Sequence, residues 1–564
     1  MDYHIIKGIA DDSTEVYIFE NELAKVPLNS LYSPEREAER FIKKIEQNGG
    51  VLIIIGLGNG ILLEKIVNNA IDEKFAAIIF IEPLKDVMIN NDHISLIKQH
   101  KNIAYYSINT FTPINFATII GKFGSIPFSI KLHPNYEKID STLTKKLIAE
   151  IKEGIEARQI INNTEMRFAL DWVIEPLLNI QFINSSINIK QLKNKFKGER
   201  AILVAAGPSL ENNLNTIEKL RKSAYIFSVG SALRVLIDSN IEPDFVTTID
   251  SSDVNFYTHF KDVNYNGIVI FETRSNSNIQ KNHNGTLIVT TAENDFVTKQ
   301  YSSDLYTFKP SPSVAVFTLQ VIEYLGFSEV FLIGQDLSLI NGDYYASGVK
   351  MHEGALNQEV ELFVESNQGN PVGTTRSLKI FLDTFEGLIK TFKNGMKIYN
   401  LSEYGAKIQG STFLSPKLIG DLPPRHEITI NDNKISTETD GKSFIHLLLE
   451  NMNKIKLELK IAEKQINNLH RSGVISKEDM KLVTKKFKKL ASNKILNEII
   501  MSNLTFVFNQ VSNKFKFFNH EENYTSENLM LLTKELLNFY HIVIKYIEEV
   551  LQDDRIASLV NKPK

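Results

Sequence analysis

One stretch, Ala201 to Asp253, constrains the fold of this 564-residue chain more than any other. Along it, apolar runs with the length of a buried strand alternate with helical patterns. The segments are, in order, strand Ala201–Ala206, the helical face of Leu214, Ile217 and Leu220, strand Tyr225–Val229, helix Ala232–Ser239 and strand Phe245–Ile249. This order predicts a βαβαβ half of a doubly wound parallel sheet, which places the chain in the α/β class.

Three loops of this stretch lie where such a sheet binds ligands, beyond the carboxyl ends of its strands. They are Gly207–Ser209, Gly230-Ser231 and Asp250–Asp253. The first leads into a helix, whose free N–H groups favour a phosphate, and its glycine allows a close approach to the backbone. The hydroxyl of Ser209 adds a further donor. The pattern predicts a nucleotide or phosphorylated ligand, although a plain strand-to-helix turn uses similar residues.

A second pair of loops follows further along the chain. Ser311 and Ser313 open a helix, and they either bind a phosphate or only cap that helix. Strand Glu329–Ile333 then leads to Gly334-Gln335-Asp336 and to a long polar stretch that ends near Gly354. A long loop on a doubly wound sheet is usually functional or disordered, and the position of this one at a strand end favours a function.

Sequence blocks on both halves of this region carry a resemblance to a known family. GPSL follows the first strand, PDFVTTID covers the third, and SPSVAVFTLQVIEYLGFSEVFLIGQDLSLINGDYYASG spans Ser311–Gly348. Together with NSLYSPEREAERF near the start and YNLSEYGAKIQG from Tyr399, they resemble the Maf family of motility-associated flagellin glycosyltransferases. The two core blocks are also similar, more distantly, to bacterial sialyltransferases that use CMP-sialic acid. The resemblance covers most of Asn29–Gly410.

The Maf resemblance implies an activity. The expected reaction is transfer of a nonulosonic acid, of pseudaminic or legionaminic type, from a CMP-activated donor to Ser or Thr of flagellin. The likeness to sialyltransferases implies that the reaction is independent of metal, so we expect no metal site and no tightly bound cofactor. Helix N-terminal amides and hydroxyls must then stabilise the departing phosphate. The expected partners are flagellin and the nucleotide sugar.

The resemblance and the loop positions together select the candidate site residues. The expected nucleotide-binding residues are Gly207, Pro208, Ser209, Ser231, Ser311, Ser313, Gly334 and Gln335. The expected catalytic residues are His352, Asp250 and Asp336. Asp336 matches the acidic position of the Gly-x-Asp loop in the sialyltransferases, which implies a contact on the nucleotide side. Asp250 either holds a ribose hydroxyl or the acceptor, or only caps the next turn.

A base is needed to take the proton of the acceptor hydroxyl, and a pKa near neutrality suits this task. In the sialyltransferases a histidine after the Gly-x-Asp loop serves as base, and His352 is the only histidine in that segment here. The residues around it match no motif one by one, so a solvated loop histidine is the alternative, with Glu353 as a fallback base. Tyr344 and Tyr345 either shape the sugar pocket or anchor the loop.

An earlier stretch, VLIIIGLGNG (Val51–Gly60), indicates a second nucleotide-type fold. A buried strand enters a turn with Gly56, Gly58 and Gly60, and Glu82 follows about 20 residues on, as in dinucleotide or S-adenosylmethionine sites. The third glycine comes one residue early for the full dinucleotide pattern. The turn therefore either holds such a ligand or only shapes a Rossmann-like scaffold domain.

Three domains are expected: a Rossmann-like α/β domain over 1–185, a doubly wound sialyltransferase-like domain over 190–425 and an α-helical bundle over 426–564. Between the first two, Thr164–Phe182 is typical of one amphipathic helix, which carries the only tryptophan, Trp172. The last domain is poor in glycine and proline, and its apolar residues repeat at four- and three-residue steps. These are Leu448, Met452, Ile455, Leu459, Ala462, Ile466 and Leu469.

Two local signals mark helix starts in the helical domain. Ser476 and Asp479 have the spacing of a capping box, in which each side chain bonds the backbone of the other. Ser526 is expected to cap the final helix.

Composition excludes several classes of protein. A net charge of −4 gives no general attraction to nucleic acid or to anionic membranes. The chain has no cysteine, hence no disulfide framework and no thiolate site. Its start lacks a basic region followed by an apolar core, and no apolar run approaches the roughly 20 residues of a membrane helix. We therefore expect a cytoplasmic protein with neither nucleic acid nor membrane as partner.

Two other functions stay open. One group of enzymes resembles the GPSL and IGQDL core but transfers pyrophosphate from ATP to a hydroxymethylpterin. That reaction needs Mg²⁺ and carboxylate clusters, and such enzymes are typically much shorter than 564 residues. A non-catalytic chaperone that binds flagellin and keeps a nucleotide fold is the third interpretation.

Overall fold

The computed structural model describes residues 3–45, 50–85, 87, 89–123, 127–139, 141–349, 359–393, 395–437, 439–473, 475–517 and 525–561. They form two compact units, one of Met1–Thr164, Leu459–Leu490 and Leu504–Ile542, and one of Glu165–Glu458, Ala491–Asn503 and Val543–Lys564. Three long helices contribute residues to both units: α5 (Ser141–Phe168), α15 (Gly441–Ser472) and α18 (Ser526–Leu551). The domain boundaries expected from the sequence stay a prediction.

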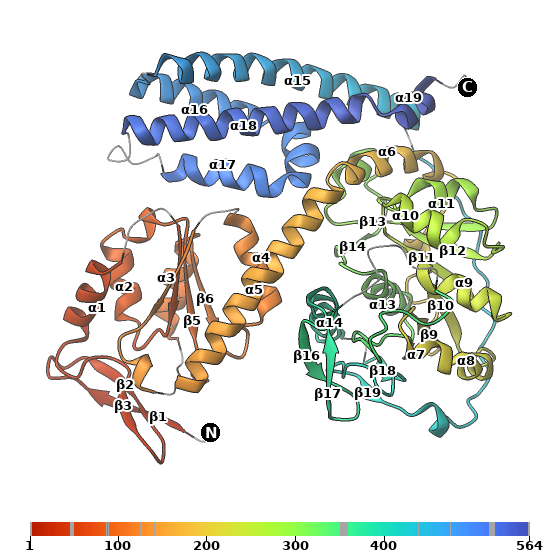
Figure 1. Cartoon of the computed structure of the whole chain (residues 1–564), viewed down its shortest axis with the longest axis horizontal. Helices are drawn as coiled ribbons and strands as arrows, with labels where there is room; N and C mark the ends of the chain where they lie inside the picture. Colours follow the sequence, from red (N-terminus) through yellow and green to blue (C-terminus); the bar gives the residue numbers. More distant parts are fainter. Residues whose placement is uncertain are drawn as a thin grey trace. The chain divides into compact units, whose positions relative to one another are not determined.

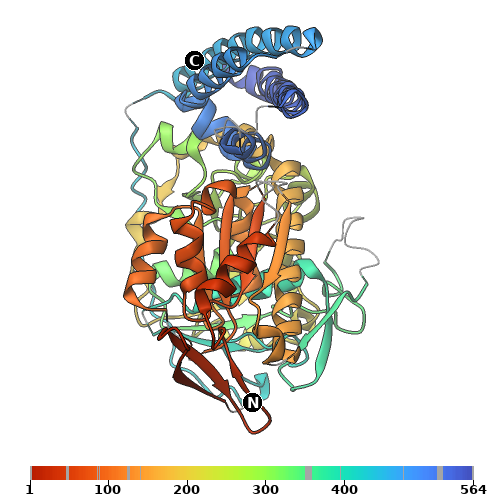
Figure 2. The same ribbon diagram turned by 90° about the vertical axis from the view of Figure 1, so that its left-hand side faces the viewer.

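The first unit contains a four-stranded parallel sheet with the order β6-β5-β4-β7. Its strands are β4 (Val51–Ile55), β5 (Ala77–Glu82), β6 (Ile103–Ser107) and β7 (Phe128–Leu132). One face packs against α1 (Pro34–Lys43), α2 (Ile61–Asn68) and α3 (Asn91–Gln99), and the other against α4 (Pro113–Ile120) and α5 (Figures 1 and 2). A three-stranded antiparallel sheet comes before it: β1 (His4–Ile9), β2 (Glu15–Glu20) and β3 (Lys25–Pro27).

The second unit is built on a ten-stranded sheet in which the strand pairs are parallel. The order is β14-β13-β12-β11-β10-β9-β15-β18-β19, and β8 pairs with β13. The strands are β8 (Ile187–Asn188), β9 (Arg200–Val204), β10 (Tyr225–Val229), β11 (Phe245–Thr248), β12 (Ile268–Glu272), β13 (Thr286–Ala292), β14 (Thr307–Phe308), β15 (Glu329–Ile333), β18 (Lys397–Asn400) and β19 (Thr412–Phe413). From β9 the chain moves outward to β14, and it then returns to β15 on the other side of β9.

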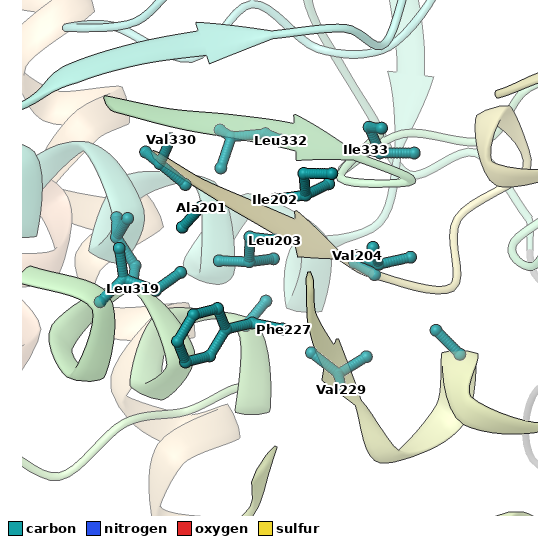
Figure 3. Packing of buried hydrophobic residues seen from close by; sticks show 14 of the residues in the cluster. Ala201, Ile202, Leu203, Val204, Phe227, Val229, Leu319, Val330, Leu332 and Ile333 are labelled. Atoms are coloured by element: carbon teal, nitrogen blue, oxygen red, sulfur yellow. The ribbon is translucent and has the colours of Figure 1, made fainter. Parts of the chain in front are cut away.

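Helices cover both faces of this sheet, as expected for a doubly wound fold with right-handed crossovers. α8 (Leu214–Leu220) and α9 (Gly230–Asp238) lie on one side, and α13 (Val314–Leu325) and α14 (Arg376–Ile389) on the other (Figure 1). Figure 3 shows the apolar side chains of β9, β10 and β15 packed together with Leu319 of α13. A strand covered on both faces needs a continuous apolar run rather than an alternating one, and this explains the sequence of β9.

Shorter elements complete the second unit. Its other helices are α6 (Asp171–Ile183), α7 (Ser209–Asn212), α10 (Asp253–Asn255), α11 (Ser277–Asn282), α12 (Phe296–Tyr301) and α19 (Asp554–Asn561). A single turn of π-helix, Phe256–Phe260, follows α10. β16 (Leu362–Glu365) and β17 (Pro371–Thr374) form an antiparallel hairpin between β15 and α14.

The helices expected after residue 426 are present. They are α15, α16 (Lys477–Ala491), α17 (Thr505–Phe517), α18 and α19. The capping box is confirmed, because Ser476 N–H donates to Asp479 Oδ2 (3.0 Å) and Asp479 N–H donates to Ser476 Oγ (3.1 Å). The predicted cap of the final long helix is wrong by one residue, since Asn528 N–H donates to the hydroxyl of Thr525 (3.2 Å) rather than to Ser526.

The segment predicted as one amphipathic helix, Thr164–Phe182, belongs to two helices. α5 ends at Phe168 and α6 begins at Asp171. The carbonyl of Ala169, at the break, accepts a hydrogen bond from the Tyr546 hydroxyl of α18 (2.6 Å). A tertiary contact therefore satisfies a carbonyl at the break between the two helices.

No helix in the described ranges combines the length and the apolar character that crossing a membrane requires.

Candidate functional site

The strand order creates a switch point between β9 and β15. The two strands are neighbours, but the chain leaves β9 towards β10 and leaves β15 towards β18. Because the two connections lead away in opposite directions, neither of them covers both strand ends. Doubly wound sheets bind ligands at such a point. The loop after β9 holds Gly207–Ser209 and the loop after β15 holds Gly334–Asp336. The fold thus brings these two predicted loops together.

The two loops are bonded directly to each other. Gly207 N–H donates to the carbonyl of Gly334 (2.8 Å), and Ser209 N–H donates to Asp336 Oδ2 (2.8 Å). The Ser209 hydroxyl lies 3.0 Å from the hydroxyl of Ser402, in the loop after β18. The Ser209 amide, which the sequence pattern suggested for a phosphate, is therefore already bonded to Asp336. The hydroxyls of Ser209 and Ser402 are buried, bond each other and also interact with the Asp336 carboxyl.

Both glycines of these loops are required by the close contact. Gly334 has a φ of +68°, and a Cβ there would lie 2.1 Å from the carbonyl oxygen of Ala205. A Cβ on Gly207 would lie 2.5 Å from both Asp336 Oδ2 and the carbonyl oxygen of Gly334. No side chain fits at either position without moving backbone atoms.

Asp336 sits at the centre of this arrangement and is 2% exposed. Burial raises the pKa of its carboxyl above the ordinary value, while the hydrogen bonds from Ser209 oppose this shift. Its Oδ1 has no hydrogen-bond partner among the described residues. Asp336 therefore positions the Ser209 turn with one oxygen and leaves an acceptor at the switch point with the other.

The loop after Asp336 folds back over the strand ends. Ala346 N–H donates to the carbonyl of Ala206 (2.9 Å), and the hydroxyl of Ser347 bonds the carboxylate of Glu211 in α7. Burial, followed by the negative charge of Asp250, raises the pKa of the Tyr345 hydroxyl. His352 and Glu353 lie outside the described residues, so the predicted base stays a prediction.

The three other predicted serines differ in what they contact. Ser231 is the second residue of α9, and its hydroxyl has no hydrogen bond to the described part of the chain. Ser313 caps α13 by accepting from Ala315 N–H (3.2 Å). The Ser311 hydroxyl accepts from Gln320 Nε2 of α13 (2.7 Å) and donates to the carbonyl of Lys309 (3.3 Å). Ser313 thus caps the helix, Ser311 is bonded to neighbouring groups without capping it, and Ser231 is available to a ligand.

Asp250 follows β11 and has a role in its own turn. Its Oδ1 accepts from Ser252 N–H (2.8 Å), and its carbonyl accepts from Asn276 N–H (3.0 Å). The turn-capping alternative is therefore present in the structure. Asp250 Oδ2 has no hydrogen-bond donor in the described ranges, so a role toward a ligand stays a prediction.

Two carboxylates of α6 have shifted pKa values, and the sequence analysis did not select them. Burial raises the pKa of Asp171 to about 6 and that of Glu175 to about 7. Glu175 is 1% exposed and accepts from Ser277 N–H (2.6 Å) and from Arg555 Nη1 of α19 (2.8 Å). Amphipathic helices commonly carry such acids, so their spacing gave no signal.

Arg274, in the loop after β12, is a buried cation near α6. It is 6% exposed, and its Nε donates to Glu272 Oε1 (2.7 Å). Its guanidinium carbon lies 5.0 Å from the centre of the Trp172 ring. Arg274 Nη1 and Glu272 Oε2 are both buried without a hydrogen-bond partner in the part of the chain that is described. This pair therefore keeps one donor and one acceptor unused.

The glycine turn of the first unit is filled by side chains of its own unit. Glu82 accepts from Leu57 N–H (2.8 Å), from Leu84 N–H (3.0 Å) and from the Tyr136 hydroxyl (2.7 Å). The same Tyr136 hydroxyl accepts from Gly58 N–H (3.1 Å). Burial raises the pKa of Glu82 to about 7. Since the acid predicted for ribose is used to hold the turn, this geometry favours the scaffold interpretation.

Among the described residues, no three His, Asp or Glu side chains gather closely enough to hold a metal ion.

Comparison with known proteins finds matches both to the region of the candidate site and to nearly the whole chain. Residues 175–342 match the family model described as 6-hydroxymethylpterin diphosphokinase MptE-like, which covers less than a third of the chain. An uncharacterized protein of Treponema pallidum (strain Nichols) is 28% identical over 127 residues, or 22% of this chain. That match spans 59% of the length of the Treponema protein.

A solved structure is similar over nearly the whole chain. It is the Maf glycosyltransferase from Magnetospirillum magneticum AMB-1, with a TM-score of 0.56, 14% sequence identity, and coverage of 99% of this chain and 95% of that one. At this identity the likeness establishes a shared fold. The mixed α/β architecture predicted from the sequence is thus confirmed at the level of the fold.

Proposed function

We propose that this chain is a glycosyltransferase that moves a nonulosonic acid, of pseudaminic or legionaminic type, from a CMP-activated donor to Ser or Thr of flagellin in the cytoplasm. The observation that carries the proposal is the bonded pair of loops at the β9–β15 switch point, with Ser209 and Asp336 in contact. The fold shared with a Maf glycosyltransferase over 99% of the chain supports it.

In this proposal the nucleotide lies at the switch point. The Ser209 hydroxyl, which then accepts from the Ser402 hydroxyl, donates to the phosphate or ribose, and Asp336 Oδ1 accepts from a hydroxyl or amino group of CMP. α9 has nine residues and no side-chain cap, so its first amides and the hydroxyl of Ser231 favour the negative phosphate. These groups would stabilise the charge on departing CMP.

The transfer step needs a bond between the acceptor oxygen and the anomeric carbon. As it forms, the bond from that carbon to the phosphate oxygen of CMP breaks, and CMP leaves with the electron pair. The proton of the acceptor hydroxyl goes to a base. His352 remains the candidate that the family resemblance implies, with Glu353 as its fallback.

The test measures the intact mass of flagellin co-expressed with this protein and a nonulosonic-acid pathway. We expect mass gains equal to whole nonulosonic acid residues, and calorimetric binding of CMP to the purified protein. Ser209→Ala should weaken CMP binding and transfer. Ser185→Ala is the matched control, because Ser185 is exposed and its hydroxyl bonds, within the described ranges, only the carbonyl of Phe182 (3.0 Å). Flagellin that co-purifies without any mass gain would favour the chaperone interpretation.

The match of residues 175–342 to MptE-like proteins favours a second candidate function, transfer of pyrophosphate from ATP to a hydroxymethylpterin. An assay with ATP, Mg²⁺ and 6-hydroxymethylpterin distinguishes the two. Formation of AMP and the pterin diphosphate, with no binding of CMP, would replace the glycosyltransferase proposal.

A further inference from the structure

The loop after β12 holds a guanidinium group that the proposed reaction has not yet used. Arg274 lies just beyond the carboxyl end of this strand and is 6% exposed. Its Nε donates to Glu272 Oε1 (2.7 Å), and its guanidinium carbon lies 5.0 Å from the centre of the Trp172 ring. A carboxylate thus holds one edge of the group, and an aromatic ring covers one of its faces.

The far end of this guanidinium is unused. Among the described residues, the bond from Nε to Glu272 is its only hydrogen bond, and Nη1 is buried without a partner. A buried charged donor without a partner is costly, so native proteins usually keep such a group for a ligand or an ordered water. The two Nη atoms of an arginine form a planar fork that matches the two oxygens of a carboxylate or a phosphate. The free end of Arg274 therefore suits an oxyanion.

Helix α6 fixes both the loop and the ring beside Arg274. Asn179 Nδ2, on this helix, donates to the carbonyl oxygens of Thr273 (2.8 Å) and Ser275 (2.7 Å), which lie on either side of Arg274 in the chain. Trp172 belongs to the same helix. The guanidinium is therefore held in position before a ligand arrives, which lowers the entropy lost on binding.

Unused polar atoms in the neighbouring groups indicate which oxyanion fits. Glu272 Oε2 and the Ser251 hydroxyl are buried without a partner in the part of the chain that is described. Ser251 lies in the loop after β11, and its carbonyl accepts from Asn276 Nδ2 (3.0 Å) in the loop of Arg274. Glu272 is paired with Arg274 and only accepts, so it requires a ligand that donates. A molecule with both a carboxylate and hydroxyls meets these needs, whereas the phosphate diester that joins CMP to a sugar has no donor.

Contacts along the carboxyl edge of the sheet connect this loop with the switch point. A Cβ on Gly230, directly after β10, would lie 3.6 Å from Asn255 Oδ1, and Asn255 Nδ2 donates to the carbonyl of Asp250 after β11 (3.2 Å). The same carbonyl accepts from Asn276 N–H after β12 (3.0 Å). β12 is the third neighbour of β9, so at about 4.8 Å per strand its end lies roughly 14 Å from the Ser209 turn. A nucleotide joined to a sugar acid is long enough to span this distance.

We propose that Arg274 binds the carboxylate of the sugar acid and so selects an acidic sugar as the donor. The inference rests on the proposed function. Nη1 and Nη2 donate to the two carboxylate oxygens, and Glu272 Oε2 accepts from a sugar hydroxyl. In a nonulosonic acid the carboxylate is bonded to the anomeric carbon, so the fork also holds the reacting carbon in place relative to CMP. A neutral sugar leaves the buried fork unpaired and is rejected for that reason.

The test compares Arg274→Lys with Arg200→Lys in the full chain, because lysine keeps the charge but lacks the fork. Arg200 is the matched control: its Nε also bonds a carboxylate, Glu329 Oε2 (3.0 Å), but it begins β9, at the opposite edge of the sheet. Calorimetry measures the binding of CMP, CMP-pseudaminic acid and CMP-legionaminic acid. We expect Arg274→Lys to weaken binding of the transferred CMP-sugar by about 10- to 100-fold and to leave CMP binding unchanged. Arg200→Lys should change neither.

Fluorescence locates the bound carboxylate, since the only tryptophan of the chain, Trp172, lies against the Arg274 guanidinium. Binding of the CMP-sugar should change the emission of the wild-type protein more than binding of CMP does, and this difference should be absent in Arg274→Lys. The wild-type protein is also titrated with the methyl glycoside of pseudaminic acid and with the methyl ester of that glycoside. The acid should act at a concentration about tenfold or more below that of the ester. Equal responses to acid and ester would overturn the assignment, even if Arg274→Lys fails to fold.

The remaining outcomes separate this inference from the proposed function. If the wild-type protein binds CMP and modifies flagellin, and Arg274→Lys binds the CMP-sugar equally well, only the assignment of Arg274 fails. If Arg274→Lys weakens CMP and the CMP-sugar to the same extent, the fork binds the nucleotide phosphate and the carboxylate assignment is wrong. If the wild-type protein neither binds CMP nor modifies flagellin, the proposed function fails and the inference fails with it.

Discussion

Replacement of Gly334 by alanine tests whether the contact between the two switch-point loops is as close as the structure describes. The residue has a φ of +68°, and a Cβ would lie 2.1 Å from the carbonyl oxygen and 2.8 Å from the carbonyl carbon of Ala205. Because both atoms belong to the backbone, no rotation of a side chain relieves the overlap. The β9 and β15 loops must move apart, and the Ser209–Asp336 hydrogen bond must lengthen or break.

The magnitude follows from comparison with a glycine that also has a positive φ but has free space around its Cα. Gly369, in the turn of the β16–β17 hairpin, has a φ of +83°, and a Cβ there would have no described atom within 4 Å. Gly369→Ala therefore carries only the left-handed conformational cost, about 1–2 kcal/mol. Gly334→Ala adds an overpacking cost of about 1–3 kcal/mol. The difference between the two variants isolates the contact between the loops.

The assay is urea unfolding followed by tryptophan fluorescence, since the single tryptophan, Trp172, lies in the second unit. With an m-value of about 3 kcal/mol/M, the midpoint of Gly334→Ala should fall about 0.3–1 M below that of Gly369→Ala. CMP binding should be lost in Gly334→Ala and retained in Gly369→Ala. Equal midpoints and equal CMP affinities in the two variants would refute the close contact and the role of these loops in nucleotide binding.

Two further predictions concern buried carboxyls, one in each unit. Glu175 has a pKa raised by burial from 4.5 to about 7, so between these values the folded chain keeps a proton that the unfolded chain releases. Its contribution to the free energy of unfolding therefore falls as pH rises from 4.5 to 7, by about 3 kcal/mol at most. In a plot of urea midpoint against pH, Glu175→Gln should flatten the curve over this range. If the curves of the wild-type protein and Glu175→Gln run parallel, the assignment is contradicted. In the first unit, Tyr136→Phe removes the hydroxyl that bonds Glu82 and Gly58, and should destabilise that unit by about 1–3 kcal/mol in a thermal melt followed by circular dichroism. Calorimetric CMP affinity should not change in this variant, and a loss of binding would mean that the glycine turn takes part in the nucleotide site.

Much of the local structure is predictable from neighbouring residues. The continuous apolar run of β9, the strand-to-helix turn at Gly207–Ser209 and the capping box of Ser476 and Asp479 all depend on residues within a few positions of each other. Backbone conformation and the burial of a strand follow from such short patterns, so the sequence alone predicts elements of this kind. It also predicts the doubly wound architecture, because alternating strands and helices leave few other topologies.

The strand order determined which residues meet in the candidate site. Ser209 meets Asp336 across 127 positions and Ser402 across 193, because β15 and then β18 are placed beside β9. Arg555 reaches Glu175 across 380 positions when α19 packs on α6. No pattern of neighbouring residues encodes these distances.

The chemical state of each acid was likewise settled by tertiary structure. Glu82 has the sequence position of a ribose-binding acid, yet packing turns it inward to hold its own loop. Asp171 has the sequence position of an ordinary helix acid, yet burial beside other carboxylates raises its pKa towards neutrality. Short patterns along the sequence specify where strands, turns and chemical groups occur. Only the packing of distant elements determined which groups meet, because burial and charge interactions depend on proximity in space and not along the chain.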